Sequence, residues 1–202
     1  ELNKRFYREL SSWYFWAINS VSFPNDVSTT RDDTVFNSEN VIRMLTRLIF
    51  IWFIKEKNLI PEAIFDEKEV AGLLKGFKGK KSTVYYRAIL QNLFFATLNQ
   101  KRDERKFASE KSFLEQKKQY GIKTLFRHAE DFNIGQKDVI KLFDSVPFLN
   151  GGLFDCLDTT DKDGKVFYHD GFSRNPKRQA QVPDELFFSE EKYIELSEFY
   201  GD

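Results

Sequence analysis

The sequence predicts a mostly α fold: an irregular helical bundle with a small β-hairpin or irregular segment toward the C-terminus. Apolar residues recur at three- and four-residue steps through the first part of the chain, which is the period of one helical face. After Pro147 the pattern changes to short apolar runs separated by glycine and aspartate turns. These two patterns predict a helical bundle at residues 1–146 and a turn-rich segment at residues 147–202 that packs on it.

Two long helices are expected at the start of the chain. The first runs from Leu2 to about Val21, and its wide aromatic face indicates that it is mostly buried. The second begins at Asn37 or Ser38, either of which can cap a helix, and runs to about Lys57. Its second half is apolar all round, so we expect it to be the most buried element.

Two shorter helices follow. Asp66 and Glu69 have the spacing of a capping box and start the third helix. After the glycine-rich basic loop KGFKGKK at residues 75–81, Ser82 can cap a fourth helix that ends near Asn99. The glycine spacing of the loop is too short to wrap a phosphate, so nucleotide binding is not expected.

The rest of the chain is less regular. Residues 101–119 are highly charged, and either an exposed helix or a mobile loop fits them. An amphipathic helix fits residues 136–145. Asp163 and Gly164 suit the corner of a small hairpin, because such corners need residues that tolerate positive φ.

Cysteine usage and hydropathy indicate a cytoplasmic protein. Cys156 is the single cysteine, so a disulfide framework is excluded and a reducing compartment is expected. The chain begins at Glu1 without an apolar leader, which argues against secretion. The most apolar stretch, Val41 to Ile54, is too short for a membrane span and carries arginines, which are expected either at an exposed edge or paired with carboxylates.

The net charge of zero hides a basic middle. Residues 75–118 hold 12 Lys and Arg against 4 Asp and Glu, whereas both flanking regions are acidic. This distribution favours contact with a polyanion at one place, with cations binding phosphates and setting orientation without reading bases. A solvated face unrelated to DNA remains the alternative. The candidate DNA-backbone contacts are Lys75, Lys78, Lys80, Lys81, Arg87, Lys101, Arg102, Arg105 and Lys106.

Several sequence blocks together resemble one protein family. They are FYRELSSWYFWA (6–17), RMLTRLIFIWFIKEKNLIP (43–61), YYRAILQNLFFATLNQ (85–100) and PFLNGGLFD (147–155), with DGFSRNPKRQ and VPDELFF near the end. They are similar to the stretch that precedes the methyltransferase domain in large bacterial restriction-modification enzymes of type IIG and IIS. The resemblance covers nearly the whole chain, and PFLNGGLFD is its most specific block.

The resemblance implies a non-catalytic helical connector. In such enzymes a spacer lies between a nuclease domain and an adenine-N6 methyltransferase, so the expected partners are these domains and double-stranded DNA. S-adenosylmethionine and Mg²⁺ belong to the parent enzyme, and no cofactor is expected in this chain. Asn150, Gly151 and Gly152 are expected to form a sharp bend at the join with the methyltransferase, since glycine readily takes positive φ. The alternative is a helical protein-interaction module of a phage-defence system that does not contact DNA.

Three stretches of the chain resemble known catalytic or metal-binding motifs, but each lacks residues or spacing that its motif requires. Asn175-Pro176-Lys177 lacks the second proline and the aromatic residue that hold a flipped adenine. Pro183-Asp184 and Glu190-Glu191-Lys192 resemble a metal-dependent nuclease motif, but five residues between them are too few for the usual hairpin. Residues 159–170 partly match a calcium loop, but they lack its terminal glutamate. The sequence therefore predicts no catalytic and no metal-binding residues.

Overall fold

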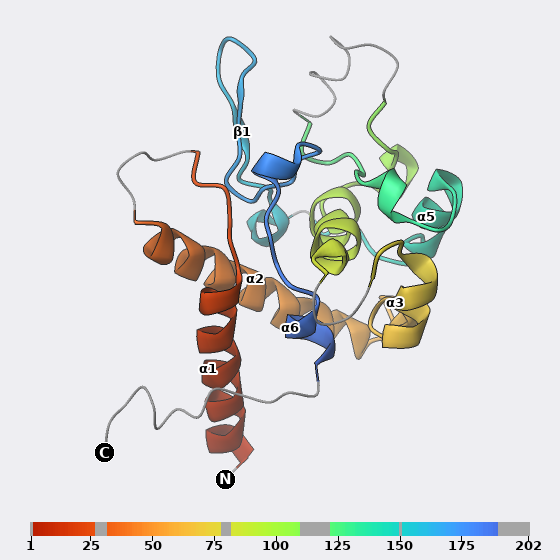
Figure 1. The fold of residues 1–202 in the computed structure, drawn as a ribbon. Coiled ribbons are helices and arrows are strands. Elements are labelled where there is room, and N and C mark those ends of the chain that lie inside the picture. Colours follow the sequence, from red (N-terminus) through yellow and green to blue (C-terminus); the bar gives the residue numbers. More distant parts are fainter. Residues whose placement is uncertain (1, 27–31, 78–81, 110–121, 150, 190–202) are drawn as a thin grey trace.

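The computed structural model describes residues 2–26, 32–77, 82–109, 122–149 and 151–189. The chain is mostly α-helical, with one small antiparallel sheet of two strands, so the predicted fold class is confirmed (Figure 1). Among the described residues, no helix is both long enough and apolar enough to cross a bilayer.

The first two helices pack against each other and cross (Figure 1). Helix α1 spans Leu2–Ser20, close to the predicted bounds. Its first half projects away from the body of the molecule, with Phe6 and Tyr7 exposed, so the expectation of a mostly buried helix is wrong for this half. Helix α2 spans Asp33–Lys55 and begins before the predicted caps, because the Asp32 carboxylate accepts a hydrogen bond from the Thr34 N–H.

A π-helical rod forms the centre of the core. It comprises η2 (Tyr86–Leu90) and η3 (Asn92–Leu98), and every residue of the two except Arg87 is buried. It ends where the sequence predicts. Its start is held by a carboxylate from far along the chain, because Asp184 Oδ1 accepts the Tyr85 N–H at 2.8 Å.

The prediction that the second helix is the most buried element is wrong. The inward face of α2 reaches the core, but its outward face is exposed along most of its length. The central position belongs to the rod at residues 86–98. A helix whose second half is apolar all round can therefore lie at the surface, and the exposure of its outward apolar residues then needs a physical explanation.

Shorter helices surround the rod. Helix α3 (Glu67–Leu73) begins as predicted, since the Asp66 carboxylate accepts the N–H groups of Lys68 and Glu69. Helix α5 spans Gln136–Leu142, inside the predicted range. Residues 101–109 form no long helix. The 3₁₀ turns are η1 (Glu62–Ile64), η4 (Arg102–Glu104), η5 (Ala129–Asp131), η6 (Gly152–Phe154) and η7 (Pro176–Arg178).

The segment after Pro147 contributes to the same hydrophobic core as the helices. Phe154, Phe172 and Val182 lie in the core cluster with residues of α2 and of the rod. The predicted hairpin is present: β1 (Thr159–Thr160) pairs antiparallel with β2 (Val166–Phe167), and Gly164 has a φ of +78°. Helix α6 (Glu185–Phe188) then packs on α1, where Trp13 Nε1 donates to the Leu186 carbonyl.

Candidate functional site: a buried arginine network and a basic side

Arg47 of α2 lies at the centre of a buried polar network. Its side chain is 1% exposed, and Nε and Nη2 donate hydrogen bonds of 2.8 Å to the carbonyls of Leu153 and Asp155. Its guanidinium carbon lies 4.9 Å from the centre of the Phe95 ring in the rod. One side chain thus ties α2, the rod and the segment that follows Pro147.

Asp170 supplies the charge that balances this arginine. Its Oδ1 lies 3.3 Å from Arg47 Nη1 and 3.6 Å from Arg43 Nη1. Its Oδ2 accepts the Leu157 N–H at 2.6 Å. The arginines predicted to lie at an edge or to pair with carboxylates therefore both pair with Asp170 of this same chain.

A second buried carboxylate, Asp158, organises the loop that carries Asp170. Burial and the nearby Asp170 charge raise the pKa of Asp158, while hydrogen bonds from the backbone act to lower it. Its two oxygens accept four successive backbone N–H groups, those of His169, Asp170, Gly171 and Phe172. Since these donors would otherwise be buried without partners, Asp158 is a structural anchor.

Cys156, Asp158 and Asp170 bring possible metal-ligand atoms within 4.8 Å of one another. Both carboxylates, however, already accept the backbone and arginine donors described above. Burial, together with the neighbouring carboxylates, raises the pKa of the Cys156 thiol, whereas metal binding needs the thiolate. The hydrogen bonds and ion pairs of the two carboxylates are those of a network that holds the fold together.

The network holds the Gly151–Gly152 bend at the surface. Both glycines are exposed, and the bend continues into η6, whose Leu153 carbonyl is bound by Arg47. Asn150 lies outside the described residues. The expected positive φ is wrong, because Gly151 has a φ of −148° and the bend is made by the 3₁₀ turn instead.

No neighbour in the described structure requires glycine at this bend. A Cβ built on Gly151 meets nothing within 4 Å, and one on Gly152 meets only Asp155 Oδ2 at 3.8 Å. Glycine is otherwise used where another backbone approaches closely. The bend is thus an open part of the surface, and it is joined to the arginine network through the Leu153 carbonyl.

Two of the predicted phosphate-binding residues, Arg87 and Arg105, instead bond to groups within the chain. Arg105 is buried and donates to the carbonyls of Thr97, Gln100, Phe143 and Val146, and burial lowers its pKa. Arg87 makes a two-pronged ion pair with Asp131, at 2.6 and 3.0 Å. Neither guanidinium is offered to a ligand outside the chain. Lys78, Lys80 and Lys81 lie outside the described residues.

The remaining predicted cations, Lys75, Lys101, Arg102 and Lys106, are exposed. Lys75 follows α3, and the other three follow the end of the rod. The Lys75 N–H donates to the Asp131 carbonyl, and Arg105 donates to Phe143. Both basic stretches therefore border residues 131–146, a neighbourhood that sequence spacing does not reveal.

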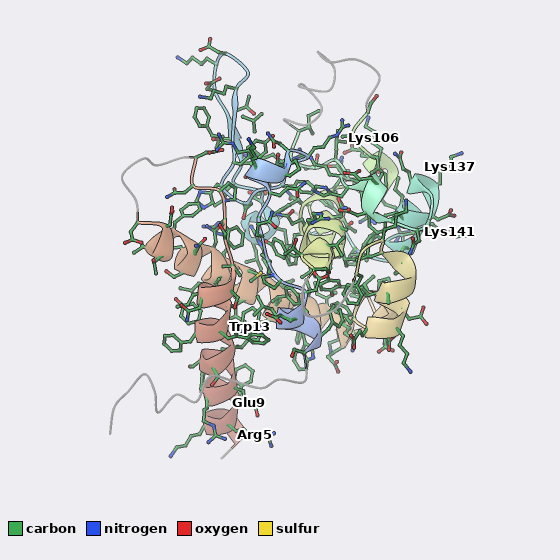
Figure 2. The ribbon with its side chains drawn as sticks, viewed as in Figure 1. Arg5, Glu9, Trp13, Lys106, Lys137 and Lys141 are labelled. Atoms are coloured by element: carbon green, nitrogen blue, oxygen red, sulfur yellow. The ribbon has the colours of Figure 1, made fainter. Side chains whose placement is uncertain are left out.

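Helix α5, which lies within residues 131–146, adds two exposed lysines that the sequence pattern did not single out. Lys137 and Lys141 are exposed, stand four apart on one helical face, and lie toward the same edge of the molecule as Lys106 (Figure 2). Acidic residues interrupt the surface, since Arg102 lies 3.5 Å from Asp144. We call the exposed cations Lys75, Lys101, Arg102, Lys106, Lys137 and Lys141 the basic side.

The residues of the partial nuclease and calcium-loop motifs have structural roles. Asp184, the acid of the nuclease match, is buried, and it binds Ser82 Oγ and the Tyr85 N–H; burial raises its pKa. Its proposed companions at 190–192 lie outside the described residues. In the calcium-loop match, Asp161 Oδ1 accepts the N–H groups of Asp163 and Lys165 and so closes the hairpin turn.

No protein-family model, no curated protein and no solved structure matches this chain.

Proposed function

We propose that this chain is the non-catalytic helical connector of a type II restriction-modification enzyme. It holds a nuclease domain and an S-adenosylmethionine-dependent adenine methyltransferase in fixed relation, and it contacts the DNA backbone through its basic side. The parent enzyme uses S-adenosylmethionine and Mg²⁺ in those other domains.

The observation that carries the proposal is that exposed cations from three separate segments lie along residues 131–146. Lys75 follows α3, Lys101 and Lys106 follow the rod, and Lys137 and Lys141 belong to α5. Because acids are interspersed, the expected contact is weak and independent of base sequence. The resemblance of the six sequence blocks and the exposed Gly151–Gly152 bend support the same role.

Titration with duplex DNA at two salt concentrations tests the proposal. Binding should be weak, indifferent to sequence and steeply weaker at the higher salt concentration. The triple variant Lys101→Ala/Lys106→Ala/Lys141→Ala should lower the affinity. It should also reduce the slope of log K against log salt by about 0.9 for each phosphate that the variant no longer neutralises.

A matched control separates specific placement from overall charge. Lys162 and Lys177 are also exposed, but they lie at the hairpin and at η7. Lys162→Ala/Lys177→Ala should leave the salt slope unchanged. Equal effects of the two sets of substitutions would contradict a contact on the basic side.

The second candidate is a protein-interaction module of a phage-defence system. The exposed apolar residues of α1 and α2 favour it, because apolar surface of this kind marks protein contacts. It predicts no detectable DNA binding even at low salt. Cleavage of DNA that depends on Mg²⁺ would contradict both candidates.

A further inference from the structure

The first half of α1 exposes part of an apolar face that the second half buries. Positions 6, 10, 13 and 17 are separated by steps of four, three and four, so their side chains lie on one side of the helix. We call Phe6, Leu10, Trp13 and Ala17 the α1 face. Ala17 is fully buried, Trp13 and Leu10 are half-buried, and Phe6 is 51% exposed. The core therefore covers one end of the α1 face and leaves the other end open.

Helix α6 contacts the α1 face at the point where its cover stops. Trp13 Nε1 donates to the Leu186 carbonyl at 2.8 Å, and the rings of Trp13 and Phe187 lie 6.5 Å apart. Trp13 lies at the level of α6, whereas Arg5 and Glu9 lie on the part of α1 that extends beyond it (Figure 2). The chain therefore leaves α6 beside the open end of the α1 face.

Ser189, the last described residue, has the backbone of a helix N-cap. Its φ of −88° and ψ of 140° are extended, and serine is among the preferred residues at this position. Glu190 and Glu191 follow, and acids are favourable in the first turn of a helix. Residues 190–202 themselves lie outside the described residues, and their sequence carries the next step.

The sequence of residues 190–202 has the pattern of an amphipathic helix. Apolar side chains recur at the period of one helical face, at Tyr193, Leu196, Phe199 and Tyr200. Acids recur at the same period on the opposite side, at Glu191, Glu195 and Glu198. Such a helix places one side against an apolar surface and the other in water.

We propose that residues 190–202 form a helix that docks antiparallel to α1 and covers the open end of the α1 face. The direction follows from the starting point, because the segment begins beside Trp13 and the open end lies toward Phe6. The length is sufficient: thirteen helical residues span about 20 Å, whereas Phe6 lies about 10 Å along the helix from Trp13. Antiparallel neighbours joined by a short link are usual in helical bundles.

The net charges of the two segments are complementary. Residues 2–10 hold three cations against one acid, a net charge of +2, and residues 190–202 hold one lysine against five acids, a net charge of −4. Lys4 and Arg8 lie on the far side of α1 from the α1 face. The attraction is therefore long-range and requires no buried ion pair.

The small size of the open end favours a tethered segment over a separate partner. A stable complex of two free proteins buries roughly 800 Å² on each side, and two side chains such as Phe6 and Leu10 do not supply that area. A segment attached at Ser189 binds intramolecularly, at an effective concentration on the order of millimolar. A small apolar contact is then sufficient.

Hydrogen exchange of residues 2–10 in the full chain tests the docking. Leu196→Glu places a carboxylate in the apolar contact, so exchange in residues 2–10 should become faster by roughly tenfold or more. Ile122→Glu is the matched control, because it makes the same change at a 45% exposed residue outside both segments, and it should leave this exchange unchanged. Circular dichroism checks that both variants are folded. Equal exchange in the two variants and the unsubstituted chain would overturn the docking.

Cross-linking in the full chain tests the position of the segment. Phe6 lies seven residues before Trp13 and Leu196 seven after Ser189, so a short bismaleimide should join the cysteines of Phe6→Cys/Leu196→Cys within one chain. Cys156 is buried and does not compete. Trp52→Cys/Leu196→Cys, with its first cysteine at a 60% exposed position of α2, should not be joined. Joining in this second variant instead, or a link between two chains, would overturn the proposal.

Discussion

Replacement of Arg47 by methionine should be among the most destabilising single substitutions in this chain. The methionine preserves much of the apolar stem but leaves the Leu153 and Asp155 carbonyls and the Asp170 carboxylate without their arginine donor. Arg43 Nη1, at 3.6 Å from Asp170, compensates only in part. Breaking a buried pair by removing one partner costs about 3–5 kcal/mol, a large share of the 5–15 kcal/mol that stabilises a typical domain.

Urea and thermal unfolding monitored by circular dichroism measure this loss. For a chain of this size, about 3–5 kcal/mol corresponds to a fall in Tm of roughly 6–20 °C. Hydrogen exchange should also increase first in residues 153–172, which the network attaches to α2. The additional substitution Asp170→Asn should recover part of the loss, since it removes the unpaired charge.

A surface ion pair provides the control. Arg102 and Asp144 lie 3.5 Å apart with side chains 59% and 58% exposed, so Arg102→Met should cost less than about 1 kcal/mol. If Arg47→Met proved as mild as Arg102→Met, the network would not hold the fold together, and the Gly151–Gly152 bend would not be rigidly held by it.

Three further predictions concern the backbone and the buried acids. Gly171→Ala should destabilise the fold strongly, because Gly171 has a φ of +66° and the new Cβ would lie 2.4 Å from the backbone nitrogen of Ala180. Gly72→Ala in α3 is the control, since the new Cβ would meet no atom within 4 Å. In urea unfolding, Gly72→Ala should be neutral or stabilising by up to about 1 kcal/mol. The imidazole of His128, whose Nδ1 lies 3.9 Å from Glu130 Oε1, lowers the pKa of Glu130 to about 2. The stabilisation from this carboxylate is therefore full above its ordinary pKa near 4.5 and is lost as the pH falls toward 2, and it should be small because the Glu130 side chain is 62% exposed. Glu130→Gln should flatten that part of the Tm–pH profile, and an unchanged profile would disprove the coupling. Asp184→Ala should cost about 1–3 kcal/mol by removing the acceptor at the start of the rod, and Asp184→Asn should cost less; equal losses for both variants would contradict this role.

Local sequence signals predicted local structure well. The N-cap at Asp66, the hairpin corner at Gly164 and the helical period of α1 each act over a few residues, and each is confirmed. The predicted start of α2 is wrong because Asp32, which precedes both expected caps, caps the helix instead. Its carboxylate has the same capping chemistry as Asn37 and Ser38, so the sequence alone does not rank the three.

The roles of the buried arginines depend on contacts between residues far apart in the sequence, and local sequence patterns do not reveal such contacts. Arg105 lies within a basic run and resembles a phosphate ligand, yet its carbonyl partners lie as far away as residues 143 and 146. Arg47 and Asp170 are 123 residues apart, so nothing local indicated their pairing. The outward apolar face of α2 misled the burial prediction for a physical reason: periodicity shows which residues avoid water but not whether the chain itself or another molecule covers them.

We propose that this chain positions reactive domains through the exposed Gly151–Gly152 bend. The most direct test of this role is Gly151→Trp in the full-length enzyme of which we propose this chain is a part, with DNA methylation and cleavage measured together. Because a Cβ at Gly151 meets nothing within the described residues, the isolated chain should keep its Tm while both activities of the enzyme fall in parallel. Full activity in that variant would contradict the account.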